Sequence, residues 1–158
     1  MQNRMKKYGL GKEQIENLLD KSLTASLATL NSDGSPYIIP VHYVYFNSKI
    51  YLHSAAKGQK LDNIQADNRI CLMVFDMERI IQNPNNMPCN TNTIYESVII
   101  QGRAEILKDF EQKRLALSEI VEKYTPGLDP GKMPEASIKA TAVVEICIDE
   151  ITGKFYNK

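Results

Sequence analysis

Residues 23–54, LTASLATLNSDGSPYIIPVHYVYFNSKIYLHS, decide the fold of this chain. Two short polar turns divide the stretch into three apolar runs. The first turn contains Asp33-Gly34, a pair that supplies the positive φ angles of a tight hairpin, and the second is Asn47-Ser48. The strands predicted from this pattern are 23–30, 36–46 and 49–54. The stretch therefore predicts three antiparallel strands connected as a meander.

The rest of the chain adds strands and a few helices. Ile15, Leu18 and Leu19 fall on one helical stripe, which predicts an amphipathic helix over 12–21. Gly102 interrupts a long apolar run and suggests a β-bulge or a barrel bend. The other expected elements are helices over 58–66 and 109–124, strands over 69–77, 94–107 and 140–151, and loops over 78–93 and 125–138.

The expected fold is mainly β, with a few peripheral helices. Six strands joined mostly as hairpins do not form βαβ units, so we expect an antiparallel sheet that is closed or nearly closed on itself. A single domain is expected over residues 9–155, with 1–8 and 156–158 as terminal extensions. Strands such as 69–77 are apolar on both faces, so one face fills the interior and the other meets a helix or a second subunit. A dimer is the economical solution.

Composition argues against several classes of protein. Lysine and arginine total 19 and aspartate and glutamate total 19, whereas nucleic-acid binders usually carry a basic excess. No apolar stretch approaches the ~20 residues of a membrane span, and residues 1–10 lack the apolar region of a signal peptide. The three cysteines form no metal-binding pattern; Cys71 and Cys147 are expected in the core and Cys89 in a loop. We expect a cytoplasmic protein without a metal site.

The segment 52–61, LHSAAKGQKL, is the richest in ligand-binding groups. It predicts a strand that ends at Ser54 and passes through small residues and Gly58 into a helix. A helix N-terminus binds anions through its free N–H groups, and Lys57 and Lys60 add the charge that a phosphate needs. The alternative is a surface turn with ordinary solvated lysines. No Ser-His-Asp arrangement, HExxH pair, P-loop or GxGxxG is present, so hydrolase and nucleotide-triphosphatase functions have no support.

Four blocks of sequence carry a family resemblance. The first block comprises Ala28, Thr29, Asp33, Gly34, Pro36, Tyr37, Pro40 and Val41, then Ile50, Tyr51, His53, Ser54, Ala55, Gly58 and Lys60. The others are Cys89 with Thr93, 95–98 and 102–104; then 122–127; then 150–154. In this order they resemble the pyridoxamine 5′-phosphate oxidase-like FMN-binding split barrels, most closely the nitroimidazole-resistance branch, over nearly the whole chain.

The resemblance implies a six-stranded antiparallel split β-barrel that forms a homodimer with two FMN sites at its interface. The phosphate is expected against Ser54, Gly58 and Lys60, and the flavin ring against the strand 40–42. The positions implied to bind the cofactor are Pro40, Val41, His42, Leu52, His53, Ser54, Lys57, Gly58 and Lys60, with Tyr95, Glu96 and Ser97 contributed by the partner subunit. Gln59 stands where relatives often carry arginine, which removes one charge available to the phosphate.

The implied activity is that of an FMN-dependent oxidoreductase that takes electrons from NAD(P)H and reduces a small organic acceptor such as a nitroimidazole. His53 is the catalytic candidate, because an imidazole can donate a proton near neutral pH; its alternative is a structural histidine at a strand end. Two other functions stay open: a non-catalytic flavin-binding or sensing dimer, and a haem-binding relative with His42 or His53 as axial ligand.

Overall fold

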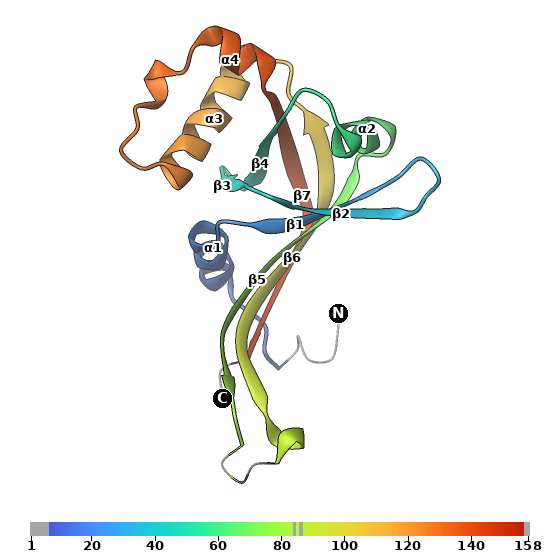
Figure 1. The fold of residues 1–158 in the computed structure, drawn as a ribbon, viewed down its shortest axis with the longest axis vertical. Helices are drawn as coiled ribbons and strands as arrows, with labels where there is room; N and C mark the ends of the chain where they lie inside the picture. The colour runs from blue at the N-terminus through green and yellow to red at the C-terminus, as the bar shows by residue number, and fades with distance from the viewer. Residues whose placement is uncertain (1–6, 84, 86, 157–158) are drawn as a thin grey trace.

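The computed structural model describes residues 7–83, 85 and 87–156. Within them, seven strands form one antiparallel sheet in the order β2-β1-β5-β6-β7-β4-β3 (Figure 1). The strands are β1 (Ala25–Leu30), β2 (Pro36–Val41), β3 (Val44–Phe46), β4 (Lys49–Ser54), β5 (Arg69–Ile81), β6 (Asn92–Ile106) and β7 (Ala142–Tyr156). The helices are α1 (Lys12–Lys21), α2 (Gln59–Ala66), α3 (Phe110–Tyr124) and α4 (Glu135–Ala140), with 3-10 turns η1 (Pro88–Asn90) and η2 (Pro130–Lys132). The expected mainly-β antiparallel class is confirmed.

The expected number of six strands is wrong, because the predicted strand 36–46 is two strands. β2 pairs with β1, whereas β3 pairs with β4, and the chain changes partner at His42 and Tyr43. The Tyr43 side chain is fully buried at this corner, so the apolar pattern continues across the break and conceals it. β2 and β3 lie at opposite ends of the strand order, so the sheet is open and not closed as expected.

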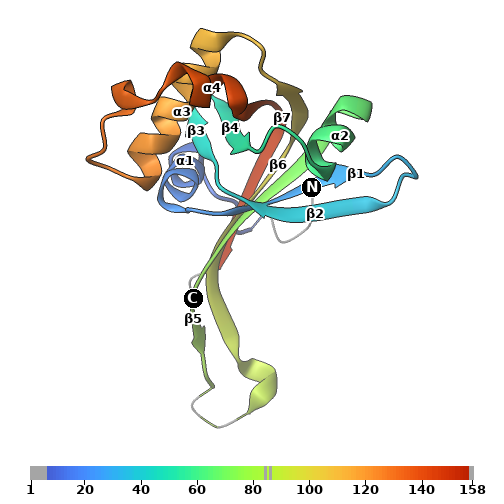
Figure 2. The same ribbon diagram turned by 45° about the horizontal axis from the view of Figure 1, so that its top comes forward.

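The strands β5 and β6 extend beyond the rest of the sheet as a long arm (Figures 1 and 2). The predicted loop 78–93 is shorter in the structure, because the pairing of the two strands continues to Ile81 and Asn92. A register shift follows Met77, where charged residues replace the alternating apolar pattern. This change in pattern is what suggests a loop from the sequence alone.

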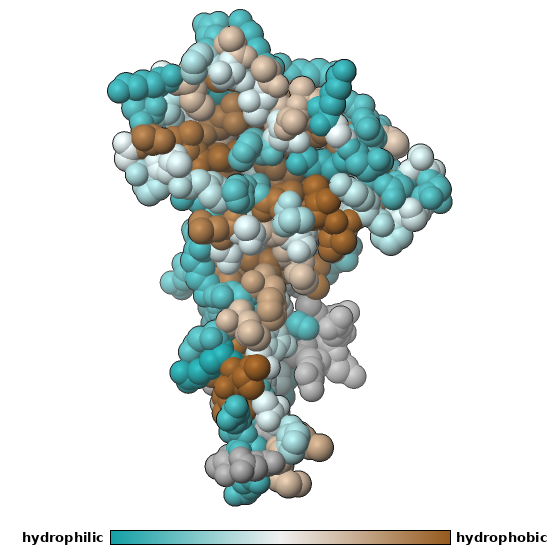
Figure 3. Space-filling model, in the orientation of Figure 1, coloured by the Kyte–Doolittle hydropathy of each residue, from teal (hydrophilic) through white to brown (hydrophobic). Residues whose placement is uncertain are grey.

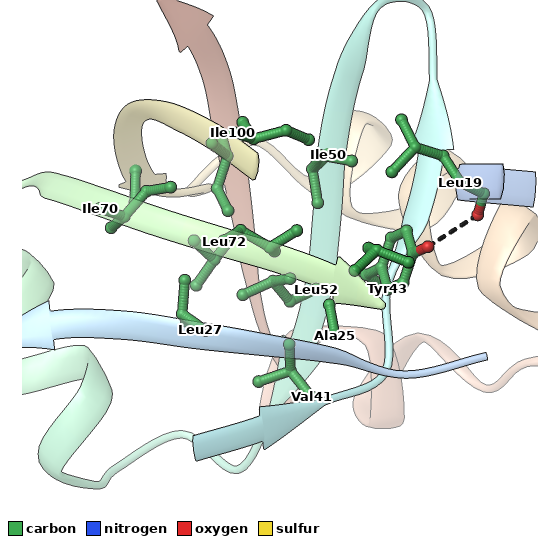
Figure 4. Packing of buried hydrophobic residues seen from close by; sticks show 14 of the residues in the cluster. Leu19, Ala25, Leu27, Val41, Tyr43, Ile50, Leu52, Ile70, Leu72 and Ile100 are labelled. Carbon is green, nitrogen blue, oxygen red and sulfur yellow. Dashed lines mark hydrogen bonds between the residues drawn. The ribbon is translucent and has the colours of Figure 1, made fainter. Parts of the chain in front are cut away.

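Two clusters of buried side chains lie on opposite faces of the sheet. In the larger cluster, Leu27, Leu52 and Leu72 point toward one another from three strands, as Figure 4 shows. The stripe predicted for α1 packs into this cluster, and all three of its side chains are buried. The smaller cluster joins the helices α3 and α4 to β3 and β7. Val143 and Val144 are adjacent on β7 and belong to different clusters, as strand alternation requires.

Two of the cysteines, Cys71 and Cys147, depart from their expected places in the core. Cys71 lies between the buried Ile70 and Leu72, so strand alternation turns its thiol to the outer face, where it is half-buried. Cys147 follows the buried Ile146 and is exposed for the same reason. A continuous apolar run does not reveal which of its two faces is covered.

Gly102 forms the bulge that the sequence predicts. The pairing of β6 with β7 shifts in register between Gln101 and Gly102. A Cβ atom at position 102 would collide with the backbone carbonyl oxygen of Cys147. Because that oxygen belongs to the neighbouring strand, it cannot rotate away, and only glycine permits the close approach.

We therefore expect Gly102→Ala to lower the free energy of unfolding by about 1–3 kcal/mol, the range for a side chain forced into a packed interior. Urea denaturation measures this change. Gly11→Ala is the control, since a Cβ there meets only the Gln14 side chain, at 3.6 Å. Equal losses in the two variants would show that the close approach at the bulge has no energetic consequence.

Candidate functional site

The turn between β4 and α2 has the geometry expected from the segment 52–61. β4 ends at Ser54 and α2 begins at Gln59. Gly58 precedes the helix with φ at 146°, a conformation that favours glycine. Its carbonyl oxygen accepts hydrogen bonds from the N–H groups of Leu61 (2.8 Å) and Asp62 (3.2 Å). The end of a strand, a flexible turn and a helix N-terminus thus follow one another directly.

Lys60 is the more buried of the two lysines in this turn. Its side chain is half-buried, and burial lowers the pKa of its ammonium. No described carboxylate contributes to that pKa. A partly buried charge is stabilised by an opposite charge, so Lys60 is a candidate binding point for an anion. Lys57 is exposed on the other side of Gly58.

Gln59 is occupied by a structural network. Its amide donates to the Asn63 Oδ1 atom at 2.8 Å. The Asn63 side chain, which is buried, donates in turn to Thr29 Oγ1 and to Asn31 Oδ1, both at 3.0 Å. The network fixes α2 to β1 and to the hairpin turn. The sequence gives Asn63 no distinguishing motif, so its role is visible only in the structure.

The two histidines meet at the edge of this turn. The ring centroids of His42 and His53 are 6.4 Å apart. Burial is the main reason that the pKa of His53 lies below its ordinary value, and the charges of His42 and Lys60 lower this pKa further. His53 is therefore mostly neutral near pH 7, and its imidazole can both donate and accept a hydrogen bond.

Tyr124, the last residue of α3, holds His42 in place. Its ring stacks on His42 with centroids 4.7 Å apart. Its hydroxyl accepts a hydrogen bond from the Tyr43 N–H (2.8 Å) and donates to the Leu23 carbonyl (2.6 Å). The sequence placed Tyr124 only at the end of a predicted helix and in the block 122–127, and that block was the available signal for its role.

Lys123 completes the support of the corner. Its ammonium donates to the Leu19 carbonyl at 2.9 Å and lies 4.0 Å from the centroid of the Tyr43 ring. The Tyr43 hydroxyl donates to the same carbonyl at 2.8 Å. Burial lowers the pKa of Lys123 to about 8. The C-terminal end of α3 thus joins α1 to the corner that carries His42.

The remaining expected cofactor residues of β2 and β4 differ in which of their atoms are accessible to a ligand. The side chains of Val41 and Leu52 are buried in the larger core cluster, so only their backbone atoms are available to a ligand. Pro40 is exposed and Ser54 is half-buried. These two side chains remain accessible beside the histidines.

Tyr95, Glu96 and Ser97 do not join the site within one chain. Ser97 pairs with Lys154 on β7, whereas His53 pairs with Val143. Eleven residues of strand separate these two partners, which corresponds to about 35 Å.

The three residues also differ in their surroundings. Glu96 forms an ion pair with Lys21 of α1 at 2.9 Å. The Ser97 hydroxyl is buried and has no hydrogen-bond partner within the described residues.

An apolar surface connects the two regions. Ile38, Pro40, Met73, Phe75 and Met77 are exposed, and the cross-strand registers place Pro40 and Met73 on either side of the same residue of β1. We call these five residues the outer face. Brown, hydrophobic atoms gather in the middle of the space-filling view and again along the arm (Figure 3). A small cavity of about 230 Å³ lies where Pro40, Met73 and Phe75 meet.

Residues 7–83, 85 and 87–156 give no support to a metal site or to a membrane-spanning helix. No group of three or more metal-ligating side chains forms among them. Within the same residues, no helix is both long and apolar enough to cross a membrane. The arrangement that is present offers a cation, two imidazoles and a strand-to-helix turn next to an apolar surface.

Solved structures share this fold. A candidate 5-nitroimidazole antibiotic resistance protein from Bacteroides thetaiotaomicron is 25% identical, with a TM-score of 0.80 over 94% of this chain and 90% of that one. The flavocytochrome Anf3 from Azotobacter vinelandii is 24% identical, with a TM-score of 0.85 over 99% and 73%. An FAD and heme binding protein from Mycobacterium smegmatis is 18% identical, with a TM-score of 0.83 over 94% and 72%. No curated protein matches the chain.

The sequence itself decides the family. The family model described as pyridoxamine 5′-phosphate oxidase matches residues 11–155, which include every strand of the sheet except the last residue of β7. The chain therefore belongs to the pyridoxamine 5′-phosphate oxidase family.

Proposed function

We propose that this protein is a flavin-dependent oxidoreductase that binds FMN at the turn between β4 and α2. In this proposal it takes electrons from NAD(P)H and reduces a small organic acceptor such as a nitroimidazole. The observation that carries the proposal is the half-buried Lys60, without a described carboxylate partner, beside His53 at a helix N-terminus. Family membership supports it, as does the shared fold with a nitroimidazole resistance protein, a flavocytochrome and an FAD and heme binding protein.

The donor set of the turn fits the phosphate of FMN. Ser54 offers a hydroxyl, the first turn of α2 offers free N–H groups, and Lys57 and Lys60 offer two positive charges. Gln59 adds no charge, since its amide is already bonded to Asn63. When bound, FMN supplies the electron-transfer chemistry that amino-acid side chains lack. The protein binds the cofactor, orients it and excludes water.

His53 is proposed to act as the proton donor. The charges of the nearby Lys60 and His42 lower the pKa of its imidazole and so favour release of its proton. His42 is fixed by its stack on Tyr124, so it restricts the position of His53 from one side. A proton donor that is ready to release its proton suits the reduction of a polar acceptor.

A homodimer completes the proposed site. Isolated exposed apolar residues are ordinary, but the outer face collects several of them next to the histidines, which is typical of an interface. Three free cysteines and no disulfide among the described residues agree with a reducing compartment, such as the cytoplasm.

If the outer face is the interface, Phe75→Glu should weaken dimerisation by at least about 30-fold, the effect of losing a strong interface contact. Sedimentation equilibrium measures the dissociation constant. Leu128→Glu is the matched control, since Leu128 is also exposed but lies in the loop after α3. A wild-type protein that sediments as a monomer and still binds one FMN per chain would contradict the shared site.

FMN titration tests the phosphate contact. The purified protein should show flavin absorption bands, either at once or after FMN is added. Lys60→Gln should raise the dissociation constant for FMN about 10–100-fold, because it removes a charge-assisted hydrogen bond worth about 1.5–3 kcal/mol. Riboflavin, which lacks the phosphate, should bind both proteins equally.

The exposed Lys108 provides the control for that experiment, since Lys108→Gln should leave both affinities unchanged. Equal losses for FMN and riboflavin in Lys60→Gln would assign this lysine a structural role. A Soret band after haem addition, with no response to FMN, would favour haem binding instead.

The pH dependence of turnover tests the proton donor. The donor is the protonated imidazole, and burial lowers the pKa of His53 below 6.5. The rate of nitro-compound reduction should therefore fall as the pH rises through this lowered pKa. His53→Ala should flatten the profile and slow reduction by about 10²–10⁴-fold while FMN stays bound. If the variant keeps the full rate with FMN bound, the function is flavin binding with a structural histidine.

A further inference from the structure

A cavity at the base of the arm lies apart from the site described above. The segment 7–10 runs beside the end of β7, where the Phe155 N–H donates to the Tyr8 carbonyl at 2.9 Å and the Leu10 N–H donates to the Gly153 carbonyl at 3.1 Å. Between this segment and the start of β6 is a space of about 520 Å³. Binding sites for small organic molecules have volumes of about 300–1,000 Å³.

Aromatic rings form much of the wall of this cavity. Tyr8, Tyr95, Phe155 and Tyr156 line it from three separate segments. The Tyr8 ring meets Phe155 edge to face, with centroids 6.2 Å apart, and meets Tyr156 at 5.6 Å. Such rings offer flat apolar surface and edges against which another aromatic ring packs.

The charge inside the cavity is positive. Lys7 and Lys154 line it, and no described carboxylate does. The Lys7 ammonium lies 5.4 Å from the centroid of the Tyr8 ring, and the Lys154 ammonium lies 5.8 Å from that of Tyr95. Threonine hydroxyls add neutral hydrogen-bond donors at the rim. Because the whole chain has no net charge, this is a local concentration of positive charge.

A second cavity, of about 390 Å³, shares three of the aromatic residues and has the opposite character. Asp76, Glu78 and Glu96 line it, and its one lysine, Lys21, is paired with Asp76 at 3.0 Å and with Glu96 at 2.9 Å. The ends of β6 and β7 that line both cavities thus have lysines on one side and carboxylates on the other. An anion would distinguish between them by charge alone.

We propose that the basic cavity is a binding site for an anionic aromatic small molecule, with the aromatic carboxylates as its ligand class. The ring packs against the tyrosines, and the carboxylate pairs with Lys7 and Lys154. Within one chain this cavity lies away from His53, since Lys154 lies eleven residues along β7 from the strand partner of His53. Tyr95 lines the cavity and also belongs to the flavin site proposed across the dimer, so competition with FMN is the test that separates the two sites. The ligand is a second molecule and not the cofactor.

Isothermal titration of the full chain with three matched probes tests the proposal. The probes are 2-naphthoate, neutral 2-naphthalenemethanol and cationic 2-naphthylmethylamine. The naphthoate should bind at least tenfold more tightly than the other two. Lys154→Gln should weaken naphthoate binding about tenfold and change binding of the alcohol less than twofold, while Lys108→Gln changes neither. Thr93→Trp should abolish naphthoate binding, because the new side chain fills the cavity.

Three outcomes would overturn the proposal. Equal affinity for all three probes would show an apolar surface without charge selection. An absence of naphthoate binding would show that the cavity is closed in solution, by a second copy or by the chain itself. Displacement of naphthoate by FMN at one equivalent per chain would assign the cavity to the flavin site. Naphthoate binding that is unchanged at saturating FMN supports the separate site, whatever the outcome of the FMN experiments above.

Discussion

The hydroxyl of Tyr124 fixes the corner on which the rest of the site depends. It accepts a hydrogen bond from the Tyr43 N–H and donates to the Leu23 carbonyl, so one group stabilises the backbone at the points where β1 begins and β2 ends. The chain can then leave β2 and pair with β4. The same ring stacks on His42. The position of a candidate site residue is therefore determined by the packing of a helix more than eighty residues further along the chain.

Burial also explains the lowered pKa values of two side chains at the turn between β4 and α2. Lys60 and His53 both have lowered pKa values, and for both the largest cause is loss of water. The positive charges near His53 add to the effect, and no described carboxylate offsets it at Lys60. Such an arrangement is unfavourable for the protein alone and becomes favourable when an anion binds. This is the physical basis for proposing a negatively charged ligand at the turn.

Local patterns in the sequence were sufficient for much of the fold. The hairpin turns, the stripe of α1 and the bulge at Gly102 each follow from a few neighbouring residues, and each is found in the structure. Of the pair Asp33-Gly34, however, only Gly34 has the expected positive φ. The division of 36–46 into two strands could not be predicted, because the buried Tyr43 continues the apolar pattern. The arm was missed for the opposite reason, since its pairing persists through charged residues. Both errors concern long-range pairing, which no local window contains.

The same limit applies to the site. The segment 52–61 showed its anion-binding groups in one continuous stretch, whereas Tyr124 and Asn63 act through contacts with distant elements. Their backbone and amide partners leave no trace in composition or spacing. The family blocks included Tyr124 but gave no reason for its presence, and Asn63 belonged to no block. Residues that bind a ligand are thus easier to recognise from sequence than residues that hold the binding residues in place.

The length of β7 makes the proposed dimer a geometric requirement of the proposed site. Its first residues pair with β4 beside the histidines, and its last residues pair with β6 beside Tyr95 and Ser97. A continuous strand cannot bring its own two ends together. A two-fold axis relating two subunits can bring them together, because the first end of β7 in one subunit then lies next to the last end of β7 in the other. The outer face runs from Pro40, near His42, to Phe75 and Met77, which pair with Ser97 and Tyr95. An isologous contact through it would place the histidines of one subunit near the arm of the other.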